Sequence, residues 1–215
     1  MSDPNDFDTR PAGLAMTASA GVGLFLMLHH PTSFDRDDGH LLADMANGVV
    51  HGGMIAVLLA LAVGVDALTR RLGPVTASTA AGRILFTTGV GAEIGAGLVN
   101  GFVMERVLAA TASGEGQTAT MTSLWMLNQA LATMGIVGIG LGAGLLAVRM
   151  VRAGRMMRVA AAVGVAMAIG APAWAVVGGG TLELVPAVVS MVMVSIWSVL
   201  VGAFLIGRDK RGTPA

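Results

Sequence analysis

Six long stretches of this chain are almost free of ionisable side chains. Only His51 and Glu93 interrupt them, and they cover residues 11–28, 45–65, 84–104, 116–148, 159–182 and 184–207. A helix that crosses a bilayer needs about 20 predominantly apolar residues. We therefore predict an all-α integral membrane protein, a six-transmembrane-helix bundle with helices near residues 12–30, 42–67, 83–105, 121–148, 158–178 and 185–206.

The composition agrees with a protein that resides in lipid. Of the 215 residues 54% are apolar and 12% are charged, whereas a soluble domain carries about 25% charged residues. The 13 basic residues balance the 13 acidic ones, so we expect no nucleic-acid partner. Cysteine is absent, which excludes disulfides, thiolate metal sites and iron–sulfur clusters. We expect a short N-terminus at residues 1–11, a single membrane domain at 12–206 and a basic tail at 207–215.

Charge asymmetry predicts the orientation. With six crossings, both termini lie on one side, and Arg36 and Arg106 are the only basic residues on the other side. Because basic residues concentrate on the cytoplasmic side of a membrane, we predict cytoplasmic N- and C-termini in the inner membrane of a bacterium.

Glycines and prolines indicate how the helices pack. Pairs of glycines four residues apart let helices approach closely, and Pro172 is expected to kink the fifth helix. Pro186 suits the first turn of the sixth helix. The glycine pairs are Gly48 and Gly52, Gly91 and Gly95, Gly97 and Gly101, Gly138 and Gly142, and Gly140 and Gly144.

Histidines gather at the predicted outer end of the first two helices. All four lie within 23 residues, and neutral imidazole is a common metal ligand. On a helix with about 100° per residue, His40, Asp44, Asn47 and His51 form one narrow stripe. The neighbours His29 and His30 point in different directions, so at most one of them faces the bundle. The predicted metal or haem ligands, open to the periplasm, are His29, His30, His40, Asp44 and His51.

A second polar set is predicted on the neighbouring helices. Glu93 lies near the predicted midplane, where a charge costs about 3 kcal/mol. It is therefore either a site for a proton, ion or ligand, or a neutral acid bonded to another helix. The residues that we expect to line a polar cavity at the outer half are Asn47, Glu93, Asn100, Asn128 and Gln129.

Three functional hypotheses follow from these residues. The first is a site for haem b or for a copper or zinc ion, used in redox electron transfer or metal handling. The second is a proton-linked carrier, or a binder of a lipid-soluble small molecule, that uses Glu93. The third is a structural subunit of a larger membrane complex or a homo-oligomer. The polar residues occupy only one half of the bundle, which favours the first hypothesis, and whether the protein is an enzyme stays open.

Overall fold

The computed structural model describes residues 8–30, 47–110, 115–178 and 184–207, and 91% of these residues are helical with no strand among them. The elements are α1 (Arg10–Leu28), α2 (Asn47–Arg71), α3 (Ala77–Leu98), the π-helical η1 (Val99–Val103), α4 (Met104–Ala110), α5 (Glu115–Met150), α6 (Arg155–Val177) and α7 (Leu184–Ile206). This part of the chain is therefore all-helical, as the sequence predicts.

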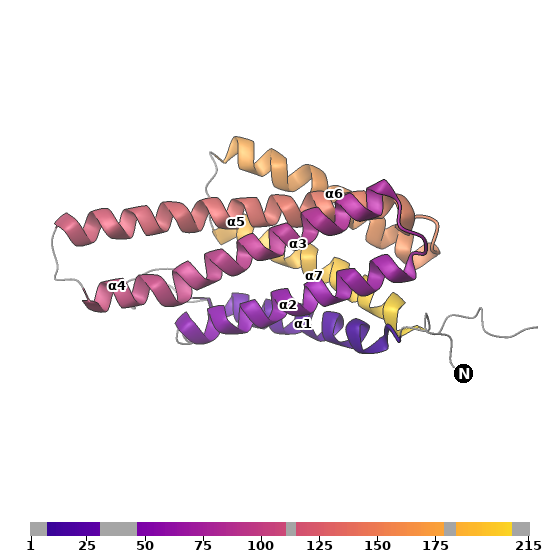
Figure 1. Ribbon diagram of the computed structural model, residues 1–215, viewed down its shortest axis with the longest axis horizontal. Helices are drawn as coiled ribbons and strands as arrows, with labels where there is room; N and C mark the ends of the chain where they lie inside the picture. The colour runs from indigo at the N-terminus through magenta and orange to yellow at the C-terminus, as the bar shows by residue number, and fades with distance from the viewer. Residues whose placement is uncertain (1–7, 31–46, 111–114, 179–183, 208–215) are drawn as a thin grey trace, which may run out of the picture.

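The helices pack in chain order into a closed ring. Each of α1, α2, α3, α5 and α6 contacts the next of these long helices, and α7 returns to α1. We call the end of the bundle near Arg10 and Ile206 the terminal end, and the opposite end, near α4 and the start of α5, the far end (Figure 1). The side chains that face the interior of the ring differ between its two ends.

Five of these helices are long and apolar enough to cross a membrane: α1, α2, α5, α6 and α7. This indicates a multi-pass protein in a lipid bilayer. The helix α3 is not in this set; it carries Arg83 and Glu93, and its regular α-helical part ends where η1 begins. The sixth crossing, and the side on which the termini lie, stay predictions.

The third and fourth predicted helices are longer than the sequence suggested. Elements α3, η1 and α4 follow one another without a break from Ala77 to Ala110. The helix starts early because Thr76 and Thr79 form a capping box, in which the Thr76 N–H donates to Thr79 Oγ1 at 2.8 Å. Helix α5 has 36 residues, about 54 Å, so α5 and α4 extend beyond the other helices at the far end (Figure 1).

Backbone contacts through glycine hold α3 against α5. A Cβ on Gly89 would lie 2.7 Å from the carbonyl oxygen of Gly135, and one on Gly142 would lie 2.7 Å from that of Gly82. Of the predicted pairs, Gly138 and Gly142 do face α3, but Gly91 has open space around it. Close glycine packing therefore occurs, with a register that differs in part from the predicted one.

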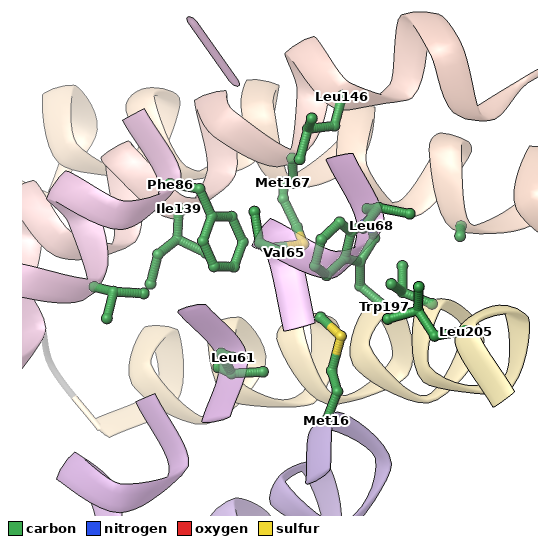
Figure 2. Close-up of a cluster of buried hydrophobic side chains, with 14 of the residues drawn as sticks. Met16, Leu61, Val65, Leu68, Phe86, Ile139, Leu146, Met167, Trp197 and Leu205 are labelled. Carbon is green, nitrogen blue, oxygen red and sulfur yellow. The ribbon is translucent and has the colours of Figure 1, made fainter. Parts of the chain in front are cut away.

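The terminal half of the ring is filled with apolar side chains. Trp197, from the middle of α7, is fully buried and stacks on Phe86 with ring centroids 5.5 Å apart. Figure 2 shows this cluster, to which α1, α2, α3, α5, α6 and α7 all contribute. Pro172 lies inside α6, which continues past it to Val177, and Pro186 lies in the first turn of α7.

Arg71 connects three elements at the terminal end. Arg71 at the end of α2 donates to the carbonyl oxygens of Leu205 at 2.7 Å and Gly207 at 2.6 Å, and to Thr9 Oγ1 at 3.0 Å. The C-terminal carbonyls of a helix have no partner within the helix. Arg71 therefore ties α2 to the last turn of α7 and to the start of α1.

Candidate ligand-binding cavity

A cavity of about 1990 Å³ occupies the far half of the ring. Ligand pockets in proteins usually measure about 300–1,000 Å³, so this one has room for a large molecule. Helices α6 and α7 supply a nearly apolar wall, whose polar groups are Ser190 and the indole of Trp174. The residues at and just after the end of α1, together with α2 to α5, supply a second wall, which we call the polar wall because polar residues stand among its apolar ones. These polar residues are His30, Asn47, His51, Glu93, Asn100, Glu105, Asn128, Gln129 and Thr133.

Two of the four histidines meet at the cavity. His30 Nε2 lies 3.2 Å from His51 Nε2, and the two rings are inclined at 67°. His51 is buried, and its Nδ1 hydrogen-bonds the carbonyl oxygen of Asn47 at 2.9 Å. A carbonyl only accepts, so Nδ1 carries the proton and Nε2 of His51 presents a lone pair toward His30.

His29 does not take part in this histidine pair. His29 turns back along its own helix, where its Nδ1 donates to the carbonyl oxygen of Phe25 at 2.7 Å. The structure thus brings His30, and not His29, to His51. His40 and Asp44, which the sequence placed in the same site, lie outside the described residues.

The π-helical turn η1 forms the floor beneath His51. A Cβ on Gly101 would collide with the Cβ of His51 and lie 2.9 Å from its Cγ. Asn47 Nδ2 donates to the carbonyl oxygen of Asn100 at 3.0 Å, which joins α2 to the same turn. π-bulges occur frequently at functional sites. Glycine at position 101 therefore lets the imidazole rest directly on the backbone of η1.

Glu93 lies deeper in the same wall. It precedes Asn100 by seven residues, about 10 Å along a helix. Its carboxyl group rests on α5, where a Cβ on Gly135 would be 2.6 Å from Oε1. Oε1 is buried and has no hydrogen-bond partner among the residues with described positions. Asn128 and Gln129, on α5, are half-buried and line the cavity, as does Asn100.

Glu105, Thr133 and Trp174 also line the cavity, but they are not among the cavity residues predicted from the sequence. Glu105 had a detectable signal, because Gly97, Gly101 and Glu105 recur every four residues and so share one helix face. In the part of the chain that the structure describes, no three His, Asp or Glu side chains form a group able to hold a metal ion.

Comparisons with protein-family models, curated proteins and solved structures found no match to this chain. The case for a function therefore comes from the cavity and its two unlike walls.

Proposed function

We propose that this protein binds an amphipathic, lipid-soluble molecule in the cavity of the far half. The observation that supports this most strongly is the division of the cavity wall. On α2 to α5 polar side chains stand among the apolar ones that line it, whereas almost purely apolar side chains line it on α6 and α7. A molecule with a hydrogen-bonding head and a hydrocarbon tail satisfies both walls at once.

The unpaired carboxyl oxygen of Glu93 supports a ligand with a polar head. Burying a polar group without a hydrogen bond costs about 1–3 kcal/mol in proteins, and Glu93 Oε1 has no such bond to the described residues. Glu93 and Asn100 stand about 10 Å apart along the helix. A head group whose polar atoms reach both Glu93 and Asn100 therefore complements this wall best.

A binding site fits the rest of the bundle better than a conduit does. The side chains of Trp197, Phe86, Met16 and Leu68 fill the terminal half, and each is fully buried. Among the residues placed by the structure, this half offers an apolar core where a carrier would need a polar path. The proposal thus develops the small-molecule hypothesis without the proton-linked transport.

Native mass spectrometry of protein extracted in mild detergent tests the proposal. We expect the wild-type chain to retain one stoichiometric lipid-soluble molecule. Glu93→Gln keeps the shape of the side chain but replaces the carboxyl group with an amide and so changes its hydrogen bonding. We therefore expect about tenfold weaker retention, equivalent to about 1.4 kcal/mol. Asp66→Asn, at the terminal end and outside the cavity, is the control. Equal retention by wild type and Glu93→Gln would contradict the proposal.

A metal ion held by His30 and His51 is the second candidate. Two imidazole nitrogens bound to one tetrahedral zinc ion at about 2.0–2.1 Å lie about 3.3 Å apart, close to the observed 3.2 Å. In the structure this contact is a hydrogen bond in which His30 Nε2 donates to His51 Nε2, so a metal ion would take the place of that proton. The Nδ1 bond of His51 to Asn47 is the kind of support that metal-binding histidines receive. Zinc would suit metal handling, and copper would also permit electron transfer.

The same distance argues against haem b in this arrangement. Axial ligands bind opposite faces of the macrocycle, which must pass between the two nitrogens. Elemental analysis of untagged protein, followed by titration with Zn²⁺ or Cu²⁺, tests the metal candidate. We expect His51→Ala to abolish binding and His29→Ala to leave it unchanged, because His29 bonds Phe25. Identical titrations of both variants would exclude the His30–His51 pair.

A further inference from the structure

We infer that the ligand enters the cavity sideways from the bilayer, between α6 and α7, and that its hydrocarbon tail stays in this gap. The inference rests on the proposed binding function and adds the route and the seat of the tail.

The gap follows from how α6 and α7 pack. Their contact is the least extensive of the six neighbouring pairs in the ring. A contact between them lies in the terminal half, where Gly164 of α6 packs near the indole nitrogen of Trp197. Toward the far end the two helices separate, and the end of α6 stands apart from the start of α7 (Figure 1).

Both helices face the cavity with one side and the surrounding lipid with the other. Ala175 of α6 lines the cavity, while the next residue, Val176, is 82% exposed. On α7, Ala187 lines the cavity, while Val192, which does not line it, is 38% exposed. The apolar wall is therefore only one helix thick, and it borders the bilayer directly.

The depth of the gap decides what occupies it. Helix α6 has 23 residues, about 35 Å, which covers the hydrocarbon core of about 30 Å. The cavity-lining residues of both helices, 166–175 on α6 and 185–194 on α7, lie within these apolar segments, so an opening between them would meet acyl chains and not water. Because the opening is continuous with the polar wall that receives the head, its occupant is the tail of the same bound molecule.

A photoactivatable monoacylglycerol tests the route. Its glycerol supplies a neutral hydrogen-bonding head, and a diazirine at the end of its acyl chain marks the position of the tail. The full-length protein, reconstituted in phosphatidylcholine vesicles, is loaded with this probe and irradiated, and adducts are mapped by mass spectrometry. We expect adducts on cavity-lining residues of α6 and α7, such as Ala171 and Val189.

A matched pair of bulky substitutions tests the entrance itself. Ala175→Trp places an indole in the gap, and we expect it to slow loading of the probe about tenfold. Val176→Trp adds an indole at the adjacent, lipid-facing position and should load like wild type. If Ala175→Trp does not fold, Ala187→Trp blocks the gap from α7.

The outcomes separate the two claims. Normal loading of Ala175→Trp and Ala187→Trp, with adducts away from α6 and α7, would overturn the lateral route and leave the binding function standing. Loading of wild type no higher than that of Glu93→Gln would overturn the binding function, and the route with it.

Discussion

Gly101 shows how a single residue shapes the site. Its missing side chain lets the ring of His51 lie on η1, and a Cβ there would be 3.3 Å from Nδ1 in addition to the closer contacts. We expect Gly101→Ala to tilt the imidazole away from Asn47 and to lower the free energy of unfolding by about 1–3 kcal/mol. Thermal unfolding in detergent and retention of the bound molecule measure both effects.

Gly97 provides the control for this substitution. It lies one turn before Gly101 on the same face, and a Cβ there would be 3.6 Å from Ile55, an ordinary contact. We expect Gly97→Ala to have the same thermal stability as wild type. Equal effects at both positions would mean that Gly101 has no special relation to His51.

At this scale the sequence predicted positions better than contacts. Helical spacing placed Asn47 and His51 on one face of α2, and both line the cavity. It did not decide between His29 and His30, because that choice depends on how the chain leaves α1. It also gave no sign of the bond from Asn47 to the carbonyl of Asn100, since a backbone acceptor has no sequence signature.

The positions of the helices along the sequence were predictable, but the register in which one helix packs against another was not. Gaps between ionisable residues delimit the long helices within a few residues at most ends. The contacts of α3 with α5 pair Gly82 with Gly142 and Gly89 with Gly135, a spacing of seven residues on each helix. A search for glycines four residues apart misses this spacing. The π-helical turn was not predicted either, because residues Val99–Val103 carry no sequence pattern that distinguishes a π-helix from an α-helix.

Gly89 and Gly91 provide a direct test of this packing. A Cβ on Gly89 would lie 2.6 Å from the backbone nitrogen of Ile139, whereas Gly91 has nothing within 4 Å. A backbone atom cannot yield as a flexible side chain does. We therefore expect Gly89→Ala to destabilise the protein by about 1–3 kcal/mol, and Gly91→Ala to be neutral or stabilising by up to about 1 kcal/mol. Chemical unfolding in mixed micelles compares them, and the opposite order would refute the packing.

Arg71 connects three elements through its guanidinium group. Removing it leaves the carbonyls of Leu205 and Gly207 without this donor. Hydrogen bonds to charged groups contribute about 1.5–3 kcal/mol, and we expect Arg71→Ala to lower stability by this amount. Arg70→Ala removes an exposed pair with Asp66, and exposed pairs contribute about 0–1 kcal/mol. Equal losses in thermal unfolding would show that Arg71 does not act as this connection.

The whole molecule divides into a packed terminal half and a hollow far half. Short loops and hydrophobic length predicted the bundle, but the cavity depends on where helices separate, which no local pattern encodes. On α2 to α5, the polar residues that line the cavity are ones that the sequence singled out, together with Glu105 and Thr133, whereas the predicted His40 and Asp44 lie outside the described residues. Stability and ligand binding are thus expected to respond to substitutions in different halves.

The number of crossings decides how this molecule sits in the membrane. Arg83 of α3 pairs with Asp66 at 3.0 Å near the terminal end, which reduces the cost of an arginine at that boundary. We therefore expect α3 to cross as the sixth span, with the terminal end in the cytoplasm. The chain has no native cysteine, so Val75→Cys, Val151→Cys and Ala110→Cys report accessibility without background.

An impermeant maleimide applied to intact cells distinguishes the arrangements. Val75 and Val151 lie at the terminal end, whereas Ala110 ends α4 at the far end. With six crossings and a positive inner side, the reagent labels only Ala110→Cys until the membrane is permeabilised. If α3 did not cross, Val75→Cys and Ala110→Cys would be labelled from the same side. Labelling of Val75→Cys and Val151→Cys alone would keep six crossings but reverse the orientation, and the cavity would then open toward the cytoplasm.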